Sequence, residues 1–194
     1  MKNDHRSQQK TALITGSAHG TCYQLAYIFA RHSYNLVLVD KGQEKLALIA
    51  EEFIQKLGIY VKTLVIDLSI STSPEEIFND LHQAAIKIDV LVNNAGFGTY
   101  RVFSETDLTT ELKMLQVNIV GLTHLNKLFL KDMIYQGYGK ILNVTSVAAS
   151  QADPLMAVYF ATKAYILSFS EVIANEIEGT GVIVTTLFPG LTGS

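Results

Sequence analysis

The sequence contains a single cysteine, Cys22, among its 194 residues. One thiol excludes a disulfide within the chain and is compatible with a reducing compartment. Charged residues are also scarce, at 17% of the chain against 48% apolar residues, and the mean hydropathy is +0.24. This composition suits an α/β domain with a deeply buried core. It also suggests that some apolar surface is covered by a partner subunit.

Three further features are lacking. The net charge of -3 provides no basic footprint, so we expect no nucleic-acid partner. No apolar run approaches the ~20 residues of a membrane-spanning helix. The first residues, MKNDHRSQQK, are polar and contain no apolar core of a signal peptide. We therefore expect a soluble, cytoplasmic protein that does not associate with membranes.

Short apolar, β-rich runs alternate with longer stretches of helical periodicity. The expected strands are Thr11–Thr15, Asn35–Asp40, Tyr60–Asp67, Asp89–Asn93, Lys140–Thr145 and Val182–Phe188. The expected helices are about Gly20–His32, Gln43–Leu57, Pro74–Ile86, Leu108–Tyr135 and Met156–Glu178. Several strands are near-continuous in Val, Ile and Leu, which is typical of parallel strands covered on both faces. The alternation predicts one α/β domain over residues 1–194, a doubly wound, Rossmann-type parallel sheet in a three-layer αβα arrangement.

Two kinds of signal mark the ends of the expected helices. Ser73, with Pro74 at the first helical position and Glu76 three residues on, predicts a capping box at the start of the third helix. Gly58, Gly137 and Gly179 follow three other helices, where a left-handed terminal residue is expected.

A glycine-rich turn joins the first strand to the first helix, over Thr15-Gly16-Ser17-Ala18-His19-Gly20-Thr21-Cys22. Glycines here allow the backbone to turn tightly and let a diphosphate approach the helix N-terminus, where free N–H groups favour negative charge. Asp40 ends the second strand, about 20 positions beyond the glycines, where a dinucleotide-binding unit holds ribose hydroxyls. The unit predicts nucleotide binding.

Tyr159 and Lys163 lie four residues apart in a helical stretch, so both side chains project from one face. An ammonium beside a phenol stabilises the phenolate, and such a tyrosine can exchange a proton with a substrate oxygen. The pair alone is commonplace on solvated helix faces. It gains meaning from a series: Asp67, Asn93-Asn94-Ala95-Gly96, Asn118, Ser146, Tyr159, Lys163 and Pro189-Gly190, with Ser146 thirteen and Asn118 forty-one positions before Tyr159.

In order and spacing, this series resembles the short-chain dehydrogenase/reductase family over almost the whole chain, from Thr11 to Ser194. The resemblance implies an oxidoreductase that transfers a hydride between a nicotinamide cofactor and an alcohol or ketone. It implies that Tyr159 is the general acid/base and that Lys163 tunes it and holds the nicotinamide ribose. Ser146 would bond the substrate oxygen, and Asn118 would kink the long fourth helix and hold a water that relays protons to Lys163.

The resemblance also assigns a cofactor set and no metal site. Gly16, Gly20 and Thr21 correspond to the diphosphate loop, with His19 where some members carry a basic side chain. Asp67 and Leu68 would lie beside the adenine, and Asn94, Ala95 and Gly96 under its ribose, while Asn93 braces the sheet. Tyr159, Lys163, Pro189, Gly190 and Thr192 would flank the nicotinamide end, and Ser194 stands where the family usually has a threonine.

The cofactor is expected to be NAD in preference to NADP. Asp40 is placed to accept hydrogen bonds from both ribose hydroxyls, and its carboxylate would repel a 2′-phosphate. Lys41 follows directly, and a basic residue there is a feature of NADP-dependent members, so NADP stays open as the alternative.

Two departures from the family bear on activity. Cys22 stands at the third glycine position, where we expect plain packing; a reactive thiol at a helix N-terminus is the alternative. The sequence stops at Ser194, so the family's substrate-covering segment and last strand are expected to be missing, leaving the sixth strand as an edge. These departures leave a catalytically impaired dinucleotide-binding protein as the second hypothesis. A methyltransferase would explain only the glycine turn and Asp40.

A homodimer is expected through the two long helices, Leu108–Tyr135 and Met156–Glu178, which in this family commonly pair across a two-fold axis. Their apolar residues lie on more than one face: Leu122, Leu125, Leu128, Phe129, Leu167, Phe169, Val172 and Ile173. The substrate is expected to be a small carbonyl or alcohol compound.

Overall fold

The structure, a computed structural model, describes residues 9–17, 20–149 and 153–190, and of Thr21 only the backbone. Within these residues, six parallel strands form one sheet in the order β3-β2-β1-β4-β5-β6. The strands are β1 (Thr11–Thr15), β2 (Asn35–Asp40), β3 (Val61–Val65), β4 (Val90–Asn93), β5 (Gly139–Val144) and β6 (Val182–Leu187).

The helices are α1 (Gly20–Arg31), α2 (Gln43–Leu57), α3 (Ser73–Gln83), α4 (Leu108–Leu115), α5 (Leu122–Gln136) and α6 (Ala157–Glu176). A π-helical segment, Gln116–Gly121, joins α4 to α5, and single turns of 3-10 helix occupy Phe103–Glu105 and Val147–Ala149. The predicted fold class and element order are confirmed.

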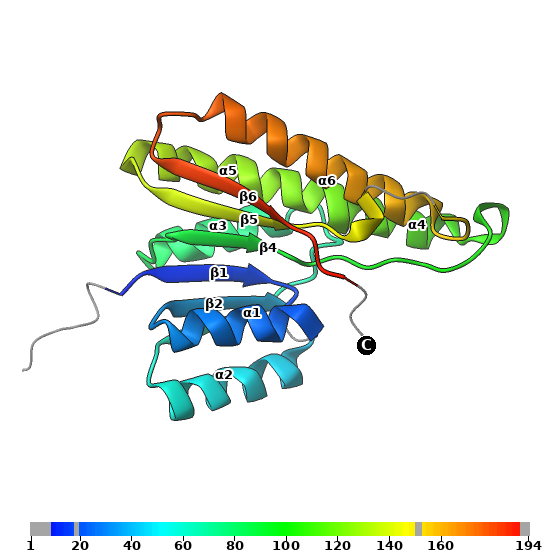
Figure 1. The fold of residues 1–194 in the computed structure, drawn as a ribbon. Helices are drawn as coiled ribbons and strands as arrows, with labels where there is room; N and C mark the ends of the chain where they lie inside the picture. Colours follow the sequence, from blue (N-terminus) through cyan, green and yellow to red (C-terminus); the bar gives the residue numbers. More distant parts are fainter. Residues whose placement is uncertain (1–8, 18–19, 150–152, 191–194) are drawn as a thin grey trace, which may run out of the picture.

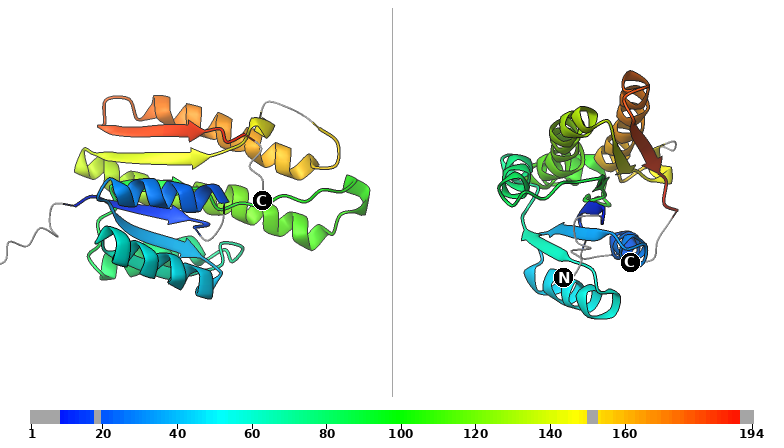
Figure 2. Two further views of the ribbon diagram at one scale, coloured as in Figure 1. Left: turned by 60° about the horizontal axis from the view of Figure 1, so that its bottom comes forward. Right: turned by 90° about the vertical axis from the view of Figure 1, so that its left-hand side faces the viewer.

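The helices cover the sheet in two layers (Figures 1 and 2). α1 and α2 pack on one face, where Ala26 and Phe53 meet the side chains of Ile14 and Leu38. α3, α5 and α6 pack on the other face, where one core cluster includes Leu13, Val37, Ile77, Phe129 and Ile177. Alternate residues of β1 therefore face opposite layers, and every residue of that strand is buried. This is why the strand reads as a continuous apolar run.

The helix ends agree only partly with the sequence signals. Gly58 and Gly137 adopt left-handed conformations at φ of 65° and 66° and cap α2 and α5, as predicted. The capping box at Ser73 is wrong, because Thr72 is the N-cap of α3 and has no capping side-chain bond. Ser73 lies inside the helix, and its hydroxyl donates to Asp67 O at 2.7 Å instead.

The long helix expected over Leu108–Tyr135 is helical from Leu108 to Gln136, with an irregular turn at Asn118, where the family resemblance implies a kink. It is interrupted by the π-helical segment around Asn118, a wider turn that frequently occurs at functional sites.

By length and composition alone, one helix of the described residues, α6, could cross a membrane, with a mean hydropathy of 1.2. α6 packs against β5 and β6, and 28% of its apolar window is buried.

The winding direction of the chain reverses at β1. β1 lies between β2 and β4, so the chain winds outward from β1 in both directions. In such sheets, ligands bind beyond the carboxyl ends of the strands where the winding direction reverses. The loops after β1, β2, β3 and β4 meet there, and they contain most of the predicted site.

Candidate active site

The glycine turn after β1 is packed directly against the loop after β4. Gly16 has a φ of +72°, and a Cβ on it would lie 2.8 Å from Ala95 Cα, a backbone atom that cannot yield. The Thr15 hydroxyl accepts hydrogen bonds from the backbone N–H groups of Asn94 and Ala95, each at 3.2 Å. Glycine is therefore required at position 16.

Cys22 follows this turn without facing the open space. Its side chain is fully buried in the core cluster under α1, and its thiol donates to Thr15 O at 3.2 Å. Burial raises the pKa of the thiol, which keeps it protonated. Plain packing, the expected role, fits this environment, and the reactive-thiol alternative is wrong.

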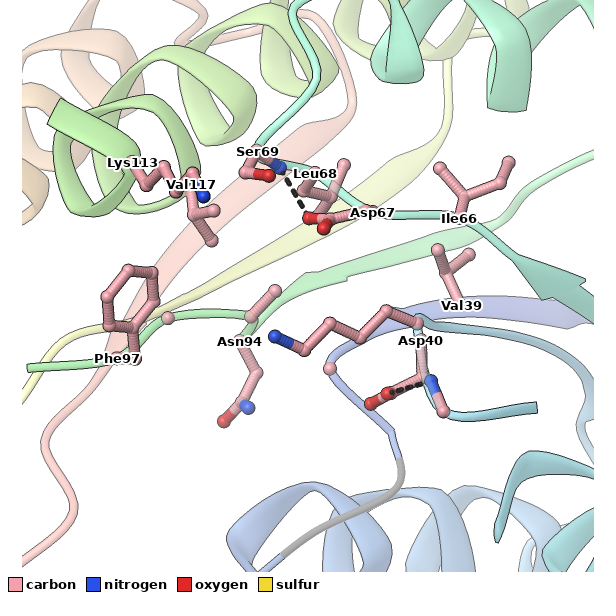
Figure 3. A pocket seen from close by; sticks show the side chains of 15 residues that line it. Val39, Asp40, Ile66, Asp67, Leu68, Ser69, Asn94, Phe97, Lys113 and Val117 are labelled. Atoms are coloured by element: carbon pink, nitrogen blue, oxygen red, sulfur yellow. Dashed lines mark hydrogen bonds between the residues drawn. The ribbon is translucent and has the colours of Figure 1, made fainter. Parts of the chain in front are cut away.

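A cavity of about 510 Å³ opens beside the turn (Figure 3). Its size is within the range of ligand pockets. Seven predicted cofactor residues line it: Gly16, Asp40, Asp67, Leu68, Asn94, Ala95 and Gly96. Lys41, named above for its bearing on NADP, also lines it. Sequence reasoning missed the other lining residues: Val39, Gly42, Ile66, Ser69, Phe97, Lys113 and Val117. Val117 was detectable as the neighbour of Asn118, and Lys113 lies one helical turn before Val117.

Two carboxylates stand on opposite sides of this cavity (Figure 3). Asp40 Oδ1 accepts a hydrogen bond from Gly42 N at 2.9 Å, which directs the side chain at the end of β2. Asp67 Oδ1 accepts from Ser69 N at 2.8 Å, and this bond, helped by the charges of Lys41 and Lys113, holds the pKa of Asp67 below its usual value. Asp67 therefore remains an anion and an acceptor at neutral pH.

Tyr159 and Lys163 lie together on α6, as their spacing predicts. The Lys163 ammonium lies 5.5 Å from the centre of the Tyr159 ring. Lys163 is 5% exposed and donates to Val144 O at 3.3 Å, and burial lowers its pKa to about 8. Thr145 at the end of β5 donates to Lys163 O at 2.8 Å, which ties this part of α6 to the sheet.

Asn118 joins the Tyr159 helix to the loop after β4. Its side chain is 1% exposed; Oδ1 accepts from Phe97 N, and Nδ2 donates to Phe97 O and to Thr162 Oγ1. Thr162 Oγ1 in turn donates to Tyr159 O at 2.7 Å. Gly96 passes close by, since a Cβ on it would lie 3.1 Å from Asn118 Oδ1 and 3.7 Å from Lys163 Nζ. The predicted catalytic residues Asn118, Tyr159 and Lys163 therefore converge.

Ser146 lies two residues after the end of β5, and its hydroxyl accepts from Ala148 N at 3.2 Å. Asn93 bonds Asn143 on the neighbouring strand at 2.9 Å, so its predicted bracing role is confirmed. Gly20 is the first residue of α1 and has a φ of +49°, while Pro189 and Gly190 follow β6.

The described residues do not include His19, Thr192, Ser194 or the side chain of Thr21. No cluster of three or more metal-ligating side chains occurs in the part of the chain that the structure describes.

The proton-transfer residues lie next to Gly96 and Phe97, two of the residues that line the cavity. The cradle at Gly16 fits a diphosphate, and the Asp40 and Asp67 carboxylates can accept from hydroxyl or amino groups. Tyr159 can donate or accept a proton beside the buried cation of Lys163.

Comparison with known proteins agrees with this geometry. A family model described as short chain dehydrogenase matches residues 10–194. The mouse protein 17-beta-hydroxysteroid dehydrogenase type 3 is 33% identical over 189 residues, which cover 95% of this chain and 60% of that protein. This chain therefore spans less than two thirds of that relative.

Solved structures give the same result. A short-chain dehydrogenase from Sphingobium yanoikuyae in complex with NADPH superposes with a TM-score of 0.88 at 29% identity, covering 93% of this chain and 70% of that one. An NAD+-bound xylitol dehydrogenase superposes with a TM-score of 0.86 at 26% identity, covering 93% and 70%. With the matched family residues and the convergent site, these findings show that the chain belongs to the short-chain dehydrogenase family.

Proposed function

We propose that this chain catalyses hydride transfer between a nicotinamide cofactor and a small alcohol or ketone, with Tyr159 as the general acid/base. The observation that carries the proposal is the convergence of Tyr159, Lys163 and Asn118. They lie next to Gly96 and Phe97, which line a cleft together with Gly16, Asp40 and Asp67, and Ser146 lies two residues after β5.

Tyr159, Ser146 and Lys163 each have a separate role in the proposed reaction. When bound, the cofactor supplies or accepts the hydride. Tyr159 gives its phenolic proton to the carbonyl oxygen during reduction and takes it back during oxidation. Ser146 donates a hydrogen bond to the same oxygen and stabilises the charge that develops there. Lys163, with a pKa of about 8, is mostly protonated at neutral pH, so its positive charge favours the phenolate.

The cofactor preference belongs to the same proposal. Asp40 lines the cleft, and a bound ribose hydroxyl can donate to its carboxylate, whereas a 2′-phosphate would be repelled. We propose NAD as the preferred cofactor, although Lys41 also lines the cleft and favours the phosphate of NADP. Both kinds of cofactor occur among the solved relatives, NADPH in the Sphingobium enzyme and NAD+ in xylitol dehydrogenase.

The test is a comparison of the wild-type chain with Tyr159→Phe. Turnover is followed by the absorbance of reduced nicotinamide, with a panel that includes a 17-ketosteroid, xylitol and aryl ketones. We expect Tyr159→Phe to lower kcat by about 10²-fold to 10⁴-fold, the usual contribution of a general acid/base, and to leave cofactor affinity within twofold.

Tyr135→Phe is the matched control, because Tyr135 is 94% exposed at the far end of α5. It should retain wild-type turnover. Cofactor binding without turnover on any substrate of the panel would favour the impaired, dinucleotide-binding alternative. Equal turnover by Tyr159→Phe and the wild type would exclude Tyr159 as the acid/base.

A further inference from the structure

Gly98, two residues beyond the matched Asn94-Ala95-Gly96 segment, lies against the ring of Tyr159. A Cβ on Gly98 would be 2.8 Å from Tyr159 Cδ2 and 3.0 Å from Cγ, and 3.1 Å from Met156 Cε. Ordinary carbon contacts are near 3.5–4.0 Å, about 0.5–1 Å longer. Even the smallest side chain at position 98 therefore requires the ring to move.

The backbone does not itself demand glycine at this position. Gly98 is absent from the glycines with a left-handed φ, so alanine is compatible with its conformation. Solvent reaches Gly98, and Tyr159 is only half-buried, so the ring has room to shift. A larger residue at position 98 would displace the phenol while leaving the core intact.

The backbone around Gly98 is held on both sides. Before it, both backbone groups of Phe97 are bonded by the buried side chain of Asn118. After it, Arg101 N donates to Leu155 O at 2.7 Å, in the turn that leads into α6. Leu155 has a φ of 76°, which is uncommon for a bulky residue and marks a conformation imposed by its surroundings. The ring, and not the loop, must therefore yield.

A third bond fixes the loop from the side of α4. Thr99 Oγ1 donates to Glu111 Oε1 at 3.1 Å, and Glu111 is only 5% exposed. Its other carboxylate oxygen, also buried, has no hydrogen-bond partner among the described residues. Burial of a carboxyl group costs free energy unless the group is hydrogen-bonded. Here its bond holds the residue next to Gly98.

We propose that the segment Gly98–Arg101 is the positioning element of Tyr159, with Gly98 setting the place of the ring and the Thr99–Glu111 bond fixing the loop. The inference rests on the proposed function for its effect on turnover. Its structural part, the contact between position 98 and the ring, does not depend on that function.

The contact is tested directly by ¹⁹F NMR of the full chain labelled with 3-fluorotyrosine. The Tyr159 resonance is the one that disappears in Tyr159→Phe. Gly98→Ala should shift this resonance and leave that of Tyr27, on the opposite face of the sheet, in place. Tyr100→Phe is the control in the same loop, since Tyr100 is 75% exposed; it should remove its own resonance and leave that of Tyr159 unchanged.

Kinetics test the consequence. A displacement near 1 Å at a reacting group can lower turnover by about 10²-fold, so we expect Gly98→Ala to lower kcat by that order and Gly98→Val to lower it further. KM for the cofactor should stay within twofold, because Gly98 does not line the cleft. A purely structural defect would instead reduce both binding and turnover.

Two variants of Glu111 test the proposal if Gly98→Ala does not fold. Glu111→Gln retains an acceptor for Thr99 and should preserve the Tyr159 resonance and kcat, whereas Glu111→Leu should change both. An unchanged resonance and kcat in folded Gly98→Ala, or in Glu111→Leu when Gly98→Ala does not fold, overturns the proposal. If Tyr159→Phe is fully active, the proposed function fails instead, and the NMR result still decides whether Gly98 positions the ring.

Discussion

Lys163 gives the stability of this protein a defined dependence on pH. Burial lowers its pKa from 10.5 to about 8, so the folded state binds this proton less tightly than the unfolded state. Below pH 8 both states hold the proton, and the folded state bears the whole penalty, about 3 kcal/mol at about 1.4 kcal/mol per unit. Between pH 8 and 10.5 the unfolded state binds more protons, and this contribution to the free energy of unfolding rises with pH.

Lys163→Met removes the buried charge and keeps a similar shape. We expect the variant to be more stable than the wild type at pH 7, by the penalty less about 1 kcal/mol for the lost bond to Val144 O. The difference should shrink as pH approaches 10. Urea denaturation at pH 7, 8.5 and 10 measures it. Cys22, whose raised pKa acts in the opposite direction above pH 9, is present in both proteins. A difference that is constant with pH would contradict the prediction.

The Asp40 carboxylate is expected to determine the preference for NADH over NADPH. With the carboxylate present, NADH should bind at least about tenfold more tightly than NADPH, a difference of about 1.4 kcal/mol. Asp40→Ser should bring the two affinities to within about threefold, because it removes the repulsion and keeps a hydroxyl. Binding is measured by the fluorescence of the reduced nicotinamide.

Lys41→Ala is the companion variant, since Lys41 lies in the same cleft but carries the opposite charge. It should weaken NADPH and leave NADH unchanged. Tighter binding of NADPH than of NADH by the wild type would refute the assignment of Asp40 as the selecting residue.

At the scale of elements, local sequence predicted most boundaries but not every irregularity. β1, β2 and α2 match their predicted bounds residue for residue, because apolar runs and flanking glycines act locally. The π-helical segment at Gln116–Gly121 has no such local signal, and a kink at Asn118 is expected only from the family resemblance. It coincides with the bonds of Asn118 to Phe97 and Thr162, which depend on two other segments of the chain. The Ser73 prediction failed for a similar reason, since Asp67 O competes for its hydroxyl.

The elements of the site were predicted unequally. Asp40, Asp67 and the Asn94-Ala95-Gly96 segment come together because the carboxyl ends of parallel strands share one edge of the sheet. Residues that reach the site through side-chain packing were missed. Lys113 and Gly98 belong to this class, and their neighbours are known only once α4 and α6 have docked.

At the scale of the whole molecule, the covered and uncovered faces of the helices decide how copies of the chain would meet. Several residues expected at a dimer interface belong instead to the core of one chain: Leu122, Leu125, Phe129 and Ile173. Leu125 and Phe129 pack in the core cluster against the sheet, which the apolar pattern of the helices alone did not distinguish from an interface. Exposed apolar residues remain on the outer surface of the same region, namely Leu108, Leu112, Val120 and Val172.

We therefore keep the homodimer as a prediction, with this outer surface as its interface. Sedimentation at micromolar concentration should give the mass of two 21.4-kDa chains. The double variant Leu112→Lys/Val172→Lys should dissociate the dimer, because it places charges in an apolar contact. Leu48→Lys is the control: Leu48 is 66% exposed on α2, on the opposite face of the sheet, and its change should leave the mass unaltered. A wild-type chain that sediments as a monomer, or a Leu112→Lys/Val172→Lys variant that stays dimeric, would show that this surface has another role.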